Sequence, residues 1–155
     1  MIRARSSATS VKRLLHGAML ALAILAVGHT TATLQRESSN DPRVVAAFAA
    51  MKSTVVPRTE GWLPRSMADF DLGMNLNLSL ALLAVVGLLG LFAQAVESQP
   101  ALVGRFLLPV LFFVVALGVT SFAFFVALPG VLLCSLAAAL ISLAVVRLRD
   151  IRGHE

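Results

Sequence analysis

Three polar residues, Asp71, Asn75 and Ser79, recur at intervals of four in a stretch that is otherwise apolar. On a helix this spacing brings the three side chains to one face. A carboxylate, an amide and a hydroxyl on one face can bind an ion or a small polar molecule, or carry a proton. Such a face is expensive in hydrocarbon, so it should point into a bundle or a wet pocket. Asn77 lies about 160° around the helix from Ser79 and belongs to a different surface.

His29 is the candidate partner of this polar face. It follows Gly28 near the end of the first apolar segment. A helix that begins near Leu14 carries His29 roughly 22 Å along its axis, which is the outer leaflet and a depth similar to that of Asp71. Histidine titrates near neutral pH, so a buried pair of this kind could sense or carry protons. We therefore predict a ligand or proton site at Asp71, Asn75, Ser79 and His29.

A structural interpretation of the acidic residues stands beside this one. Ser66 and Asp69 have the spacing of a capping box, in which each residue satisfies a free backbone N–H of the other at the start of a helix. Asp71 would then only complement the positive end of the helix dipole. On this interpretation Ser66 and Asp69 are capping residues and Asp71 has no ligand.

The sequence offers little else for catalysis or metal binding. His16, His29 and His154 lie at different depths, so they cannot form a two-histidine haem site within one chain. Zinc held by His29 with Asp69 or Asp71 would lack a recognisable ligand spacing. There is no nucleophile elbow or phosphate loop, and Cys134 is a lone cysteine in an apolar segment. We expect no catalytic residues, no metal, no cofactor and no enzymatic activity.

The elements that position these residues follow from composition. The chain has 155 residues, of which 58% are hydrophobic and 14% charged, whereas soluble domains are about half apolar and a quarter charged. The apolar residues form long uncharged blocks, and a membrane span needs about 20 such residues. Leu128-Pro129-Gly130 divides the last block by a tight turn. We predict an all-α fold, a four-helix transmembrane bundle forming a single domain over 1–155, with spans at about 14–35, 72–96, 106–128 and 131–148.

The flanking charges predict an orientation. Lys and Arg precede the first span and follow the fourth, which places both termini in the cytoplasm. The loop 36–71 balances its cations with acids and belongs outside. Arginine outnumbers lysine, which is typical of a GC-rich bacterial genome and suggests a bacterial inner membrane. The alternative is that the first span is a cleaved signal peptide, although no A-x-A site follows it.

The outer loop has structure of its own. Asp41 is a typical N-cap before Pro42, and a helix should run from Pro42 to about Val55. Val44, Phe48, Met51 and Val55 form an apolar stripe along it, so this short amphipathic helix should rest on the mouth of the bundle or in the lipid interface. Trp62 stands where an interfacial aromatic residue is expected.

Three segments carry a resemblance: "GHT" at 28–30, "VVAAFAAMK" at 44–52 and "RSMADFDLGMNL" at 65–76. They resemble a bacterial family of small four-span inner-membrane proteins without an assigned activity. The family has glycine-histidine at the outer end of span one and an aromatic-Asp-Phe sequence at the start of span two, where this chain has Ala68 instead of the aromatic residue. The resemblance implies architecture and directs attention to His29, Asp69 and Phe70.

These observations favour a non-enzymatic binding or assembly module in the membrane. The alternative is the handling of a small molecule, an ion or a proton through the polar face at Asp71, Asn75 and Ser79. The expected partners are membrane lipid and either further copies of the chain or another membrane protein. No basic helix interleaved with aromatic residues is present, so we expect no nucleic-acid binding.

Overall fold

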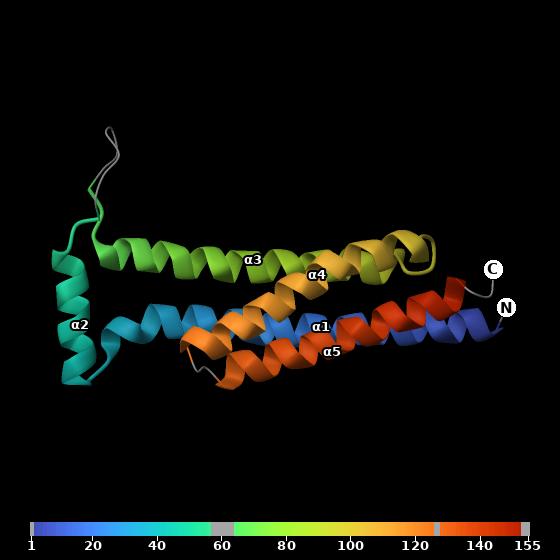
Figure 1. Ribbon diagram of the computed structural model, residues 1–155, viewed down its shortest axis with the longest axis horizontal. Helices are drawn as coiled ribbons and strands as arrows, with labels where there is room; N and C mark the ends of the chain where they lie inside the picture. Colours follow the sequence, from blue (N-terminus) through green and yellow to red (C-terminus); the bar gives the residue numbers. More distant parts are fainter. Residues whose placement is uncertain (1, 57–63, 126–127, 153–155) are drawn as a thin grey trace. The chain divides into compact units, whose positions relative to one another are not determined.

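The protein is predominantly helical in the part of the chain that the computed structural model describes, residues 2–56, 64–125 and 128–152 (Figure 1). The only extended pairing there is an isolated bridge between Val55 and Ser66. The predicted all-α fold is confirmed. In chain order the elements are α1 (Ile2–Gln35), the short 3₁₀ helix η1 (Arg36–Ser38), α2 (Pro42–Ser53), α3 (Met67–Ala95), α4 (Pro100–Thr120), the π-helical turn η2 (Ser121–Phe125) and α5 (Leu128–Arg152).

Four of these helices are long and apolar enough to cross a membrane. They correspond to the four predicted spans and have the length and composition expected of a multi-pass membrane protein. The candidate spans are Ser7–Ser38, Met67–Ala95, Pro100–Ala123 and Leu128–Asp150.

The helices extend beyond the apolar blocks that predict them. Helix α4 begins at Pro100 rather than near Phe106, because charge at Arg105 ends an apolar block without ending a helix. The Leu128-Pro129-Gly130 segment forms the first turn of α5 instead of a turn between two helices. Proline is tolerated there because the first N–H groups of a helix have no intrahelical partner.

The chain divides into two compact units. Unit 1 comprises Met1–Leu25 and Leu82–Glu155, and unit 2 comprises Ala26–Ala81. Each unit contains part of α1 and part of α3. The expectation of a single domain over 1–155 stays a prediction.

Unit 1 is a four-helix bundle with an apolar core. Its fully buried side chains recur every seven residues along each helix, the repeat of knobs-into-holes packing in left-handed bundles. They include Leu15 and Leu22 in α1, Leu82, Leu89 and Val96 in and after α3, Leu107 and Val114 in α4, and Cys134, Ile141 and Leu148 in α5.

Helix α1 runs antiparallel to α3 in both units. In unit 1, Lys12 Nζ lies 2.6 Å from Glu97 Oε1, and the methyl carbon of Met19 lies 3.3 Å from where a Cβ of Gly90 would be. In unit 2, Thr30 bonds to Ser79, and Arg36, directly after α1, bonds to Asp71. Residue numbers rise along one helix as they fall along the other. The start of α1 and the end of α5 lie at the same end of unit 1 (Figure 1), as the prediction of both termini on one side requires.

Unit 2 has a different interior. Among the described residues of this unit, the buried ones are Ala26 and Ala68 together with the polar Thr33 and Ser79. Helix α2 lies across the end of α1 and the start of α3 within this unit (Figure 1). Two backbone bonds, Met67 N to Thr54 O at 2.8 Å and Val56 N to Arg65 O at 3.0 Å, join the segment after α2 to the start of α3.

Candidate functional site

The predicted polar face of α3 is a continuous set of hydrogen bonds. Asn75 Nδ2 donates to the backbone oxygen of Asp71 at 2.8 Å and to its carboxylate oxygen Oδ1 at 3.1 Å. Ser79 Oγ donates to the backbone oxygen of Asn75 at 3.2 Å. Ser79 is buried, while Asp71 and Asn75 are half-buried. Each polar side chain on this face therefore has a partner within its own helix.

Helix α1 contributes a second partner for Ser79. Thr30 Oγ1 lies 2.9 Å from Ser79 Oγ and 2.8 Å from the backbone oxygen of Ala26. Thr30 carries one hydroxyl proton, so it donates to one of these acceptors at a time. When Thr30 donates to Ala26, its oxygen can still accept from Ser79. The pair thus ties α1 to α3 in either arrangement.

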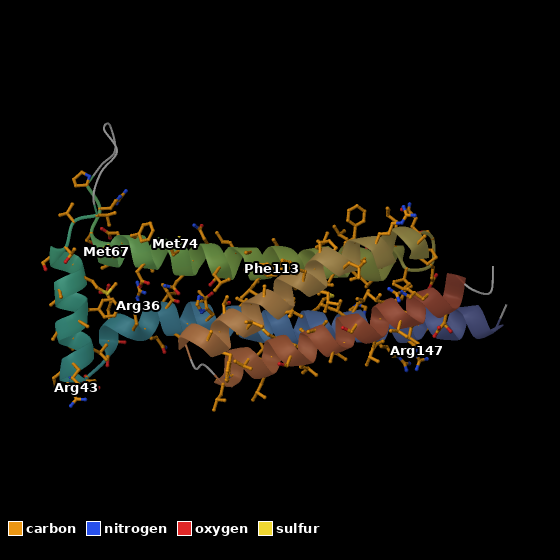
Figure 2. The ribbon with its side chains drawn as sticks, in the orientation of Figure 1. Arg36, Arg43, Met67, Met74, Phe113 and Arg147 are labelled. Atoms are coloured by element: carbon orange, nitrogen blue, oxygen red, sulfur yellow. The ribbon has the colours of Figure 1, made fainter. Side chains whose placement is uncertain are left out.

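The carboxylate of Asp71 has a cationic partner that the sequence interpretation missed. Arg36 Nη1, at the start of η1, donates to Asp71 Oδ2. The same guanidinium lies over the ring of Phe48 in α2, with its carbon 5.1 Å from the ring centroid. Figure 2 labels Arg36 beside the middle of α2 and Arg43 at the start of that helix. Arg36 is thus the residue that connects α1, α2 and α3 in unit 2.

A seven-residue spacing could have identified Arg36. Leu15, Leu22, His29 and Arg36 follow one another at this interval on α1 and η1, and the first two are fully buried. A residue in the same repeat should face the same neighbours. The spacing therefore places Arg36 on the side of α1 that packs against α3.

His29 occupies the third place in this repeat. The side chain is half-buried, and its Nε2 atom is buried with no hydrogen-bond partner in the described parts of the chain. No hydrogen bond joins His29 to Asp71 among these residues, and the partners of the Asp71 carboxylate are Arg36 and Asn75. The four predicted site residues thus comprise a bonded set of three on α3 and a separate histidine on α1.

The start of α3 has the geometry of a capping box. Ser66 Oγ accepts from the backbone nitrogen of Asp69 at 3.1 Å, and Asp69 Oδ2 accepts from the backbone nitrogen of Ser66 at 3.1 Å. Ser66 Oγ also donates to Asp69 Oδ2 at 2.9 Å. These contacts engage Asp69 Oδ2 at the helix end and explain the residue as a cap without a ligand.

Helix α2 has the expected N-cap and ends earlier than expected. Asp41 Oδ1 accepts from the backbone nitrogen of Arg43 at 2.8 Å. The helix ends at Ser53 rather than near Val55, since Val55 adopts the extended pairing with Ser66. The apolar stripe therefore stops at Met51, and Val55 is exposed. Trp62 lies outside the described residues.

A small cavity lies between η1 and α2. Its volume is about 190 Å³, and it is lined by Arg36, Glu37, Val44, Val45, Phe48, Ala49 and Lys52. Lys52 Nζ bonds to Glu37 Oε2 across it at 2.8 Å. Ligand pockets for organic molecules have volumes of about 300–1,000 Å³. This cavity is smaller than that range, and its charged groups are engaged in ion pairs, Lys52 with Glu37 and Arg36 with Asp71.

Within the described ranges, no three His, Cys, Asp or Glu side chains are grouped as metal ligands. His16 is exposed in the first half of α1, with Nδ1 2.7 Å from the backbone oxygen of Lys12. Chemically, the polar face of α3 can hold helices in place.

Comparison with known proteins gives no match to a family model, a curated protein or a solved structure.

Proposed function

We propose that this multi-pass membrane protein works by binding another membrane protein, with α2 as the recognition element and without catalysis of its own. One observation carries the proposal: α2 is a formed helix of 12 residues in which no residue is buried. A helix of this length is marginal in water by itself, so its contacts with Arg36 and Glu37 hold it in shape. These contacts leave the other side of α2 exposed, where a partner can bind.

The side chains of α2 favour a protein partner over lipid. Val44, Phe48 and Met51 are half-buried against the rest of unit 2. The opposite side exposes Ala46, Ala50 and other small or polar residues. Helices that insert into the lipid interface present large apolar residues, whereas a flat alanine surface lets another backbone approach closely.

Site-specific photo-crosslinking tests this surface. The photoreactive residue p-benzoylphenylalanine replaces Ala46 or Ala50 in the full chain in cells, and replaces the exposed Leu132 of α5 as the control. The expected result is one discrete protein adduct from the α2 positions and none from Leu132. Adducts with lipid alone, or equal adducts from all positions, would contradict the proposal.

Catalysis needs a separate measurement. The protein is purified in mild detergent and analysed by mass spectrometry for bound metal, lipid and protein. A stoichiometric metal, or consumption of a substrate by the isolated protein, would overturn the non-enzymatic assignment.

We also place the protein in a bacterial inner membrane, with both termini cytoplasmic and α2 outside. The cations flanking the first and fourth spans support this orientation, and the resemblance carried by Gly28-His29 and by Asp69-Phe70 implies the same location. In cells expressing Ser53→Cys or Ser7→Cys without Cys134, an impermeant thiol reagent should label only the first variant. The reverse pattern, or a processed N-terminus beyond Val27, would contradict it.

A second candidate function is the handling of a proton, an ion or a small molecule at Asp71, Asn75 and Ser79. It is favoured by the buried and unpartnered Nε2 of His29, which is the one such atom in the described chain. The variants His29→Gln and Asp71→Asn separate the candidates. Loss of a transport or growth phenotype with unchanged thermal stability would favour this second function.

A further inference from the structure

One face of α3 has no partner within the described residues. Six residues at alternating spacings of four and three are all exposed, and they include Leu80 at 63% and Leu91 at 62%. This spacing defines a single line along a helix. We call it the outer α3 face: Gly73, Asn77, Leu80, Ala84, Gly87 and Leu91.

The outer α3 face differs from an ordinary lipid-facing surface of the same protein. On α4 and the start of η2 the exposed line at the same spacing consists of the bulky apolar residues Leu108, Phe112, Val115, Val119 and Phe122. The outer α3 face has two glycines instead, and a Cβ added to Gly73 or Gly87 would meet nothing within 4 Å. Small residues of this kind allow another helix to approach closely in a membrane.

The amide of Asn77 gives a separate reason to expect a partner on this face, because it needs hydrogen bonds. It is exposed, and its amide makes no hydrogen bond within the described parts of the chain. It lies six residues beyond Asp71, about 9 Å further into the span. An amide facing hydrocarbon at that depth loses the hydrogen bonds that it makes in water. Contact with lipid therefore leaves it unsatisfied.

A second copy of the same face satisfies this amide. A carboxamide is both donor and acceptor, so two asparagines related by a twofold axis can bond to each other. Copies in one membrane share an orientation, and their α3 helices are parallel. In a parallel pair, equal positions of a heptad line meet at equal depth, and a single Asn there fixes the alignment and the number of helices.

We propose that the outer α3 face is a self-association surface, in which Asn77 bonds to Asn77 of a second copy and Gly73 and Gly87 bring the two α3 helices together. The proposal does not depend on the role given to α2, because the two surfaces share no residue. If one of the two proposals fails, the other can still be tested.

Disulfide crosslinking in native membranes locates the contact. In a Cys134→Ala background, Leu80→Cys should form a disulfide-linked dimer on mild oxidation. The matched position is Leu132→Cys, which is 67% exposed on α5 and should crosslink at least about five-fold less. Equal crosslinking at the two positions would overturn the proposal, as would crosslinking of Leu80→Cys chiefly to a different protein.

Energy transfer between labelled copies in phosphatidylethanolamine–phosphatidylglycerol vesicles measures the affinity. Asn77→Leu should weaken association about five- to thirty-fold, the range for one interhelical hydrogen bond in a membrane. Gly87→Ile should weaken it by bulk. Gly28→Ile is the matched control, since Gly28 on α1 also has nothing within 4 Å of an added Cβ, and it should leave association unchanged.

The three association variants should fold because Gly28, Asn77 and Gly87 are exposed, and circular dichroism checks this directly. Wild-type association of Asn77→Leu would overturn the proposal. So would an equal loss of association in Gly28→Ile and Gly87→Ile.

Discussion

Units 1 and 2 place different kinds of residue on the same seven-residue repeat. On α1 the repeat is Leu15 and Leu22 in unit 1, then His29 and, in η1, Arg36 in unit 2. On α3 it is Leu82 and Leu89 in unit 1, preceded by Asn75 in unit 2. The same helix face is thus apolar in one unit and polar in the other.

The difference separates two things that a packed helix face does. The repeat determines which residues face the neighbouring helix, and the residue type determines what holds the faces together. Unit 1 relies on dispersion between closely packed side chains, and unit 2 on hydrogen bonds and ion pairs. The largest fully buried side chains all belong to unit 1. We therefore expect unit 1 to account for most of the free energy of unfolding. We expect the hydrogen bonds and ion pairs of unit 2 to determine which residues of α1 and α3 face each other.

The largest loss of stability is expected from a mutation in the core of unit 1. Leu107→Ala removes a side chain with 0% exposure and should lower the free energy of unfolding by about 2–5 kcal/mol. The neighbouring Leu108 is 49% exposed, so Leu108→Ala should cost far less. Titration with sodium dodecyl sulfate, followed by circular dichroism, measures both variants. Equal costs would show that unit 1 is not held by its core.

Close helix approach in unit 1 gives the next largest effect. A Cβ added to Gly118 would lie 3.1 Å from the Cβ of Cys134, an atom held by its backbone. Gly118→Ala should therefore destabilise the protein by about 1–3 kcal/mol. In Gly17→Ala the neighbour at 3.1 Å is the end of the flexible Leu140 side chain, which can move. This variant should be neutral in the same titration, and a reversed order would contradict the assignment.

Unit 2 should respond to the loss of charge pairing. A double-mutant cycle with Arg36→Leu and Asp71→Leu should give a coupling free energy of about 1 kcal/mol, near the upper end for partly exposed pairs. The control cycle uses Lys52 and Glu37, whose side chains are 56% and 52% exposed, against 18% and 38% for Arg36 and Asp71. Its coupling should be about 0.2–0.5 kcal/mol. A larger coupling free energy in the control cycle would contradict the assignment of Arg36 as the residue that connects the helices of unit 2.

The smallest effect is expected from the hydrogen bond between Thr30 and Ser79 in unit 2. Thr30→Val and Ser79→Ala each remove one hydroxyl of the bond between α1 and α3, and their cycle should give about 0.6 kcal/mol, the average for such bonds in membranes. Val is close to Thr in shape, so packing is retained. Zero coupling would show that each hydroxyl is satisfied by its own helix, through Ala26 O and Asn75 O.

Hydropathy and caps were sufficient to predict the fold. Uncharged blocks located the four long helices, and Asp41 with Pro42 located the start of α2. The ends of the helices are harder to predict. A charged residue such as Arg105 ends an uncharged block of the sequence, but the helix continues through it. Val55 could not be distinguished from a helical residue, since its extended conformation depends on pairing with Ser66.

The candidate site shows a similar division. The spacing of Asp71, Asn75 and Ser79 was enough to place them on one face, because that depends only on the helix period. The pairing of Arg36 with Asp71 depends on how α1 aligns with α3, which is a property of two helices. A search for seven-residue repeats would have supplied half of this information, by placing Arg36 on the packed side of α1.

The side-chain contacts that hold α2 against η1, Lys52 with Glu37 and Arg36 with Phe48, are both electrostatic. The screening length falls from about 10 Å at 0.1 M ionic strength to about 3 Å at 1 M, so added salt weakens exposed contacts of this kind. Dispersion between packed leucines in unit 1 is not screened. A rise in the ionic strength of the surrounding medium therefore weakens these two contacts of α2 while it leaves the packing of unit 1 unchanged.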